Sequence, residues 1–281
     1  MNTTSHPPVW QQHASQWELV GAPLRPSPID AVLMRSAVLA RHGQAARDLQ
    51  VGVLGVTPEV VGLDWPLGST IRAFDHSADM VQKVWRPHPT LHSEVCLTDW
   101  SQLPMASGSV DVFAGDNSLG ALPTFAKSQE VLRELHRAIK PTGLLCLRCF
   151  IAPEVPETLQ AIKDDVAQGR VQSFHALKWR LAMALCSGPD QNVVVHRIVE
   201  CFDTLFPDRQ ALSRVHGWPL VVINTIDAYR DKDVLYTFFT LAALERFAAP
   251  WFTIQGIQYP DYELAPRCPT VTLVPHASAA P

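Results

Sequence analysis

The sequence is poor in charge and has no concentration of positive charge. Only 18% of the 281 residues are charged, the formal net charge is −4, and the lysines and arginines form no cluster. Contact with nucleic-acid phosphates requires a basic face, so no nucleic-acid partner is expected. No apolar run approaches the length of a membrane span, and the polar N-terminus is no signal peptide. We therefore expect a cytoplasmic protein with no membrane partner.

Closely spaced cysteines are also scarce. Of six cysteines, only Cys146 and Cys149 have the two-residue gap found in zinc sites. This pair lies in the apolar stretch GLLCLRCFI, which predicts a strand, and side chains three residues apart on a strand point to opposite faces. We therefore expect free thiols in a reducing compartment and no metal site.

A complete glycine-rich loop is missing from the stretch around which the chain is organised, VGVLGVTPEVVGLDWPLGSTIRAFD at 51–75. Its apolar start, Val51 to Val56, predicts a strand. Thr57 can cap a following helix with its hydroxyl, and Pro58 suits the first helical position because it has no N–H to leave unpaired.

A second apolar run in this stretch ends on Asp75, twenty residues after Gly55. Strand, turn, helix and a second strand with a terminal acid form the arrangement in which a carboxylate holds a nucleotide's ribose. The expected third glycine is absent, because Val56, Thr57 and Pro58 stand where a glycine-rich loop would be.

Further apolar runs alternate with helical patterns through residue 151. Strands are expected at 94–97, 109–114 and 144–151, and helices are expected between Ser77 and Pro87 and from Phe125 to Ile139. Nearly continuous apolar strands alternating with helices predict a parallel sheet that is covered on both faces.

After strand five the pattern changes, and four amphipathic helices follow with no strand between them. They are expected at 157–168, 173–187, 193–206 and 234–247. Strands return at 251–259 and 270–275, close enough to form an antiparallel pair. We therefore divide the chain into an N-terminal segment and helix (1–43), an α/β domain (44–152 and 250–275), and a helical insertion (153–249).

Arg25 lies within PLRPSP, where prolines enforce an extended backbone before a helix that starts at Ser27 or Asp30 and ends near Gly43. A guanidinium fixed in this way could clamp a carboxylate through two hydrogen bonds. A solvated arginine is the alternative.

Two stretches carry a resemblance to a known family. TDWSQLPMASGSVDVFAGDNSL and VLRELHRAIKPTGLLCL resemble class I S-adenosylmethionine-dependent methyltransferases in their acid, Leu-Pro pair, Asp-starting strand, arginine-bearing helix and Lys-Pro-Gly-type turn. The resemblance implies an α/β fold: a Rossmann-like, seven-stranded, mostly parallel sheet with a terminal antiparallel strand, plus an α-helical insertion after strand five. It also implies methyl transfer from S-adenosylmethionine, at a site covered by the insertion.

The resemblance assigns roles to individual positions. Asp75 would accept from the ribose hydroxyls, Gly55 would let the main chain approach the methionine part, and Asp99 would accept from the adenine amino group. The expected cofactor-binding residues are Arg25, Gly55, Val56, Thr57, Asp75, His76, Met80, Asp99, Trp100, Asp116, Asn117 and Ser118.

The residues that would bind the methyl acceptor are less clearly indicated by the sequence. A general base is needed only for a poorly ionised hydroxyl or a protonated amine. The candidates are Asp116, His175 and Tyr236, with His196 and His216. The insertion is rich in aromatic residues, namely Phe174, Trp179, Trp218, Tyr229, Tyr236 and Phe238. Such walls suit a small-molecule acceptor beneath a lid, although the same residues would also suit a plain helical core. No oligomeric state follows from the sequence.

Two other functions compete with methyl transfer. The altered glycine loop would also suit a non-catalytic protein that binds S-adenosylmethionine or a protein partner. A nicotinamide-dependent oxidoreductase is a further alternative, disfavoured by the missing GxGxxG motif and by the terminal antiparallel pair.

Overall fold

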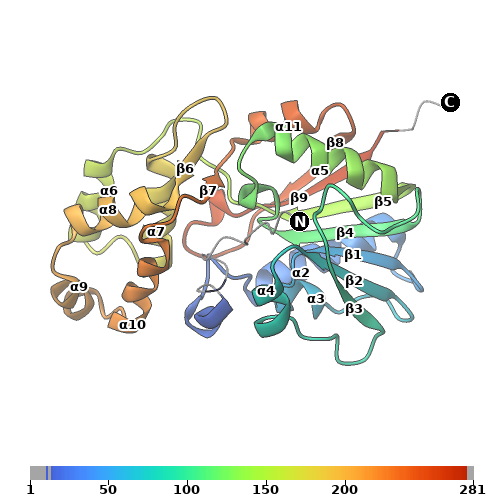
Figure 1. Ribbon diagram of the computed structural model, residues 1–281, viewed down its shortest axis with the longest axis horizontal. Coiled ribbons are helices and arrows are strands. Elements are labelled where there is room, and N and C mark those ends of the chain that lie inside the picture. The colour runs from blue at the N-terminus through green and yellow to red at the C-terminus, as the bar shows by residue number, and fades with distance from the viewer. Residues whose placement is uncertain (1–10, 12–13, 277–281) are drawn as a thin grey trace, which may run out of the picture.

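The computed structural model describes residue 11 and residues 14–276. Its larger lobe, on the right of Figure 1, is built on a seven-stranded sheet. The strands lie in the order β3-β2-β1-β4-β5-β9-β8. Their bounds are β1 (Gln50–Leu54), β2 (Thr70–Asp75), β3 (Ser93–Leu97), β4 (Val110–Asp116), β5 (Ile139–Arg148), β8 (Phe252–Gln258) and β9 (Thr270–Pro275). Strands β1 to β5 pair in parallel, whereas β9 is antiparallel to both β5 and β8. The expected mostly parallel sheet with an antiparallel strand near its edge is confirmed.

Helices cover both faces of the sheet. One face packs against α2 (Pro28–His42), α3 (Pro58–Val61) and α4 (Ala78–Lys83), and the other against α5 (Phe125–Ala138) and α11 (Leu241–Ala248). The buried residues of β5 alternate between these two cores, as the pleat of a strand requires. Cys146 belongs to one core and Cys149 to the other, so the two thiols lie on opposite faces, as the spacing predicted.

Local capping explains where some of these helices begin. The carboxylate of Asp30 accepts a hydrogen bond from the Ser27 backbone N–H at 2.7 Å at the start of α2, and Ser77 Oγ accepts from the Met80 N–H at 3.3 Å at the start of α4. The prediction that the Thr57 hydroxyl caps α3 is wrong, because its side chain makes no capping hydrogen bond. Pro58 still opens that helix, which is only four residues long.

The insertion forms a second lobe with its own core, on the left of Figure 1. It contains α6 (Leu159–Ala167), α7 (Phe174–Ala184), α8 (Val195–Leu205), α9 (Arg209–His216) and α10 (Leu220–Ile223). Strands β6 (Asn192–Val194) and β7 (Leu235–Thr237) add a small antiparallel sheet.

Short 3-10 helices occur in several connections of the chain. They are η1 (Trp17–Leu19), η2 (Leu119–Ala121), η3 (Asn224–Tyr229) and η4 (Ala265–Arg267).

The expected helix at 234–247 is wrong in its first half. Residues 235–237 pair with β6, and α11 starts after Thr240, whose hydroxyl accepts from the Ala243 N–H. Because α11 packs against α5 and β8, the helical lobe ends before it and not at residue 249. No helix among the described residues is long and apolar enough to cross a membrane.

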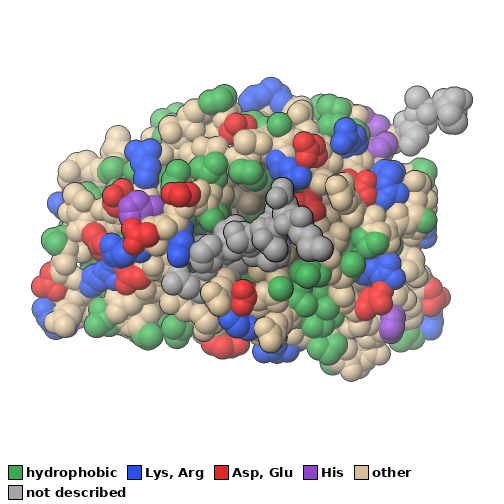
Figure 2. All heavy atoms as spheres, in the orientation of Figure 1, with side chains coloured by type: hydrophobic (Ala, Val, Ile, Leu, Met, Phe, Trp, Pro, Cys, Tyr) green, Lys and Arg blue, Asp and Glu red, His purple; other side chains and the backbone are tan. Residues whose placement is uncertain are grey.

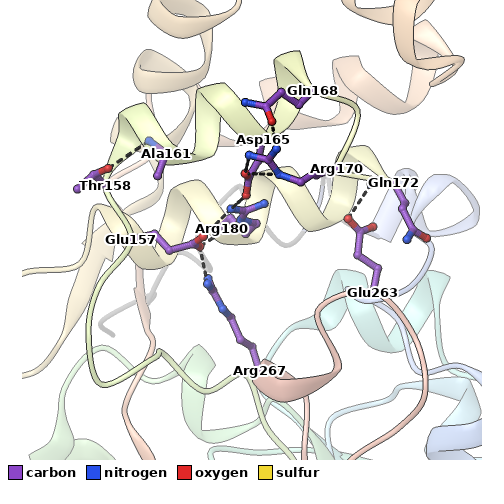
Figure 3. A network of polar contacts seen from close by, with 10 residues as sticks. All are labelled: Glu157, Thr158, Ala161, Asp165, Gln168, Arg170, Gln172, Arg180, Glu263 and Arg267. Carbon is purple, nitrogen blue, oxygen red and sulfur yellow. Dashed lines mark hydrogen bonds and ion pairs between the residues drawn. The ribbon is translucent and has the colours of Figure 1, made fainter.

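A polar network joins the helical lobe to the connection between β8 and β9 (Figure 3). Glu157 accepts from Arg180 of α7 at 2.5 Å and from Arg267 of η4. Arg180 also pairs with Asp165 of α6 at 2.5 Å. On the face shown in Figure 2, acidic and basic side chains are interspersed among the described residues.

A buried cation, Arg148 at the end of β5, connects the sheet with segments far away in the sequence. Its guanidinium pairs with Asp116 at the end of β4 (2.6 Å) and with Asp30 of α2 (3.2 Å). It also donates to the hydroxyl of Tyr262 (2.9 Å) and to the carbonyl of Pro23. Arg148 has no exposed surface and the carboxylates of Asp30 and Asp116 are buried beside it, so loss of the guanidinium would leave two buried charges unpaired.

We predict that Arg148→Met lowers the free energy of unfolding by about 3–5 kcal/mol, because Asp30 and Asp116 would be left as buried carboxylates without a cation. Urea unfolding followed by circular dichroism would measure it. Arg170→Met is the matched control, since Arg170 is half exposed and its loss should change stability by less than about 1 kcal/mol. An equally small effect of Arg148→Met would contradict the prediction.

Candidate functional site

A cavity lies where the carboxyl ends of β1, β2 and β4 face the helical lobe. Ligands bind at this edge in open α/β sheets. The sheet side contributes Leu54, Gly55, Val56, Thr57, Asp75, His76, Met80, Trp100, Asp116, Asn117, Ser118, Ala121 and Leu122. The opposite side consists of Trp17, Val20 and Leu24 from the N-terminal segment, and Phe150, Lys178, Trp179, Tyr229 and Tyr236 from the chain after β5.

Gly55 makes the turn that opens this cavity. Its φ of +99° lies in the region that favours glycine, and its N–H donates to the Phe74 carbonyl at 2.8 Å. A Cβ added here would lie 3.9 Å from the Trp100 ring and 4.0 Å from Asp75 Oδ2. Val56 lines the cavity too, but its side chain is buried in the core around α2 to α4. Gly55 alone therefore provides this turn, although the sequence has no complete glycine-rich loop here.

Asp75 ends β2 at the floor of the cavity. Its Oδ1 accepts from the Ser77 N–H at 2.8 Å, so the carboxylate also holds the loop that leads into α4. Burial raises the pKa of Asp75 to about 6, against the lowering effect of the hydrogen bonds from the Ser77 and His76 backbone. The group is ionised at neutral pH and has acceptor capacity left for a ligand.

At the end of β4 the three predicted polar residues differ in their partners. Burial raises the pKa of Asp116 to about 6, but Arg148 pairs with this carboxylate and keeps it ionised at neutral pH. Ser118 donates to the Leu54 carbonyl at 3.0 Å. The Oδ1 atom of Asn117 is buried without a hydrogen-bond partner among the described residues, and Asn117 has a φ of 50°. Asn117 Oδ1 is therefore an acceptor that no described donor uses.

Trp100 lines the cavity, whereas Asp99 does not. The Trp100 indole N–H donates to the Phe74 carbonyl at 2.7 Å, which fixes the ring beside Gly55. Although partial burial opposes it, hydrogen bonds from Ser101 and the nearby ammonium of Lys127 lower the pKa of Asp99. Asp99 instead lines an adjoining hollow that shares Trp100 with the cavity. The adenine contact predicted for Asp99 therefore lies next to the cavity, not in it.

Arg25 also lies outside the cavity. Its guanidinium pairs with Glu59 of α3 and lies 5.2 Å from the centre of the Trp17 ring. The predicted carboxylate clamp thus binds a carboxylate of the protein itself. Arg25 anchors the N-terminal segment, from which Trp17 and Leu24 reach the cavity wall.

Some of the candidate bases line the cavity and others lie outside it. Tyr236 lines the cavity, but His175 does not, since its Nε2 lies 3.1 Å from the Leu19 carbonyl. Burial and the neighbouring Lys178 lower the pKa of His175 to about 4. His196 accepts from a backbone N–H at 2.9 Å, and His216 stacks on Trp218, both away from the cavity. Of the predicted bases, Tyr236 and Asp116 remain at the site.

Sequence reasoning missed Lys178. It occupies the fifth position of α7, on a side of the helix that also buries Phe174 and Leu181. A lysine at i+4 from one buried apolar residue and i−3 from another is the signal that could have identified it. In the described part of the chain, no group of three His, Cys, Asp or Glu side chains could hold a metal ion.

The comparisons with known proteins concern the same part of the chain. Residues 49–147 match the model of a protein family described as "Methyltransferase domain". No curated protein sequence matches the chain.

Solved structures share the fold at low identity. The methyltransferase CcbJ from Streptomyces caelestis has a TM-score of 0.53 and 12% identity, covering 96% of this chain and 99% of that chain. A second similar structure is a chain of the complex between the Haloferax volcanii Trm112 methyltransferase activator and the putative methyltransferase. Its TM-score is 0.51 and its identity 13%, and the match covers 97% of this chain and 100% of that chain. A putative Zn-dependent alcohol dehydrogenase from Rhodobacter sphaeroides has a TM-score of 0.53 and 13% identity, and the match covers 95% of this chain and 98% of that chain.

The family match extends from just before β1 to the last residues of β5, the strands whose ends form the cavity floor. The sheet order and the antiparallel β9 agree with it. Residues 49–147 are therefore similar to a methyltransferase domain, and the chain has the seven-stranded, mostly parallel α/β fold expected of class I methyltransferases.

Proposed function

We propose that the protein transfers a methyl group from S-adenosylmethionine to a small-molecule acceptor. One observation carries the proposal: the ends of β1, β2 and β4 and an aromatic wall from the helical lobe face each other across a single cavity. The family match at 49–147 supports the reaction class. The enclosing wall supports a small acceptor, because a polymer would need an open groove at the end of β4.

The residues of the sheet side fit the cofactor. Asp75 provides an ionised acceptor for ribose hydroxyls, and the main chain at Gly55 has no side chain to block a close approach. Asn117 provides a buried carbonyl oxygen without a partner, which is unfavourable unless a ligand donates to it. Trp100 and Met80 provide apolar surface for a flat base.

S-adenosylmethionine supplies an already activated methyl group on a sulfonium, so the protein needs mainly to align the acceptor and exclude water. Phe150 and Trp179 make part of the acceptor side apolar. Leu24 of the N-terminal segment lines the same side, held in place by the ion pair between Arg25 and Glu59. Removal of water from this space strengthens the electrostatic interactions within it.

Turnover tests the proposal. Purified protein is incubated with S-adenosylmethionine and either the low-molecular-weight fraction or the protein fraction of a cell extract, and S-adenosylhomocysteine is measured by mass spectrometry. We expect its formation only with the low-molecular-weight fraction. Formation with the protein fraction alone would exclude a small acceptor. Binding without any turnover would indicate the non-catalytic function, and calorimetric binding of NAD instead of S-adenosylmethionine would indicate an oxidoreductase.

We predict that Asp75→Ala weakens the binding of S-adenosylhomocysteine by about 1.5–3 kcal/mol, the scale of hydrogen bonds to a charged group. Isothermal titration calorimetry would measure it. Asp64→Ala is the control, because Asp64 is exposed and forms an ion pair with Arg35 at the surface, away from the cavity. Arg25→Lys should bind as well as wild type, since Arg25 lies outside the cavity. Unchanged affinity in a folded Asp75→Ala protein would refute the ribose contact.

We predict further that affinity for S-adenosylhomocysteine falls as the pH falls through about 6. Asp75 has its pKa raised to about 6, so it is ionised above that value and loses its charge below it. If only the ionised form binds the ribose, affinity should drop about tenfold between pH 7 and pH 5. Asp75→Asn should bind weakly and with much less pH dependence. An equally steep profile in Asp75→Asn would assign the titration to another group, such as Asp116.

A further inference from the structure

Lys178 is a buried lysine that has no ion-pair partner in the described part of the chain. Only 1% of its surface is exposed, and it lines the cavity from α7. Its ammonium nitrogen lies 5.0 Å from the centre of the Tyr229 ring and 5.9 Å from that of Trp179. Among the described residues, no carboxylate forms an ion pair with it. The other buried cation described above, Arg148, has two.

This position is unfavourable for a charged amine. A lone ammonium removed from water is destabilised unless it is paired, and the two aromatic rings compensate only in part. Burial lowers the pKa of Lys178 to about 7 as a result. The side chain is therefore close to balance between its neutral and charged forms at neutral pH, and an anion placed beside it would favour the charged form.

A second unsatisfied donor lies next to it. The indole N–H of Trp179 is buried with no hydrogen-bond partner among the described residues, and Trp179 lines the same cavity. The indole N–H and the charged form of the amine donate hydrogen bonds and accept none. A buried donor without an acceptor destabilises the protein unless a ligand supplies the acceptor. An oxygen that carries negative charge is the acceptor that suits both donors.

We propose that Lys178 binds an oxyanion of the acceptor, so that the enzyme selects small, apolar molecules bearing a carboxylate or an ionised phenol. This inference rests on the proposed function and specifies its substrate class. An anion here would also offset the repulsion between the ammonium and the sulfonium of the cofactor. Trp179 donates its N–H to the same oxyanion, and Phe150 provides part of the apolar surface beside it.

Calorimetry with matched pairs of probes tests the proposal. Benzoate is compared with benzamide, and 4-nitrophenolate with 4-nitroanisole, each titrated at pH 8 into protein loaded with S-adenosylhomocysteine. Wild type should bind at least one anion tenfold or more tightly than its neutral partner, and the tighter anion distinguishes a carboxylate from a phenolate site. Lys178→Met should lose this preference while its affinity for the neutral probe is unchanged. Lys163→Met, an exposed lysine on α6, is the control and should behave as wild type.

Two readouts separate binding by Lys178 from a structural role. Anion binding to wild type should take up a proton, seen as a dependence of the binding enthalpy on the buffer, and Lys178→Met should take up none. Competitive labelling with acetic anhydride measures the pKa of the Lys178 amine without any variant, and benzoate or 4-nitrophenolate should raise it. A Lys178 pKa that neither benzoate nor 4-nitrophenolate changes would overturn the proposal.

Other outcomes would overturn it as well. Equal binding of anionic and neutral probes, or no binding of either anion, would exclude an oxyanion site. A tenfold loss of S-adenosylhomocysteine affinity in Lys178→Met would assign Lys178 to the cofactor's own carboxylate. If S-adenosylhomocysteine did not bind wild type at all, the proposed function would fail. The same titrations of cofactor-free protein would then still decide whether Lys178 binds an oxyanion.

Discussion

The structure depends on one buried charge, that of Arg148. A guanidinium fully removed from water must be paired, and its partners come from β4, α2, the segment at Pro23 and the connection after β8. The ion pair between Arg148 and Asp116 also holds Asp116 in the lining of the cavity. Stability and site geometry therefore share one interaction, and a change at Arg148 would alter both.

The cavity combines two walls of different electrostatic character. The sheet side carries Asp75 and Asp116, whose pKa values are raised by burial to about 6, so both are ionised at neutral pH. The lobe side carries Lys178, whose burial lowers its pKa to about 7. Carboxylates thus lie on one side of the cavity and a titratable amine on the other. This separation follows from the fold, because the two walls come from different lobes with different cores.

Much of the α/β part could be predicted from local patterns. Apolar runs located the strands to within a few residues, and β9 occupies the predicted residues 270–275. The spacing from Gly55 to Asp75 brought two cavity residues together, because parallel strands end at the same edge of a sheet. The helical lobe was predicted less well. Residues 235–237 form a strand because β6 lies beside them, and no local pattern reports a partner more than forty residues away.

The sequence by itself determined the strands of the α/β part, the turn at Gly55, the acid at Asp75 and the opposite faces of Cys146 and Cys149, because these follow from contacts or periodicities within a few residues. Only the tertiary structure decided which charged groups reach the cavity. Arg25 is paired with Glu59, and Asp99 with Ser101 of its own turn and with Lys127. Lys178 has two aromatic rings beside it and no ion pair with a carboxylate among the described residues. Charge pairing depends on distances between segments remote in sequence, and the desolvation that shifts a pKa depends on everything packed around the group.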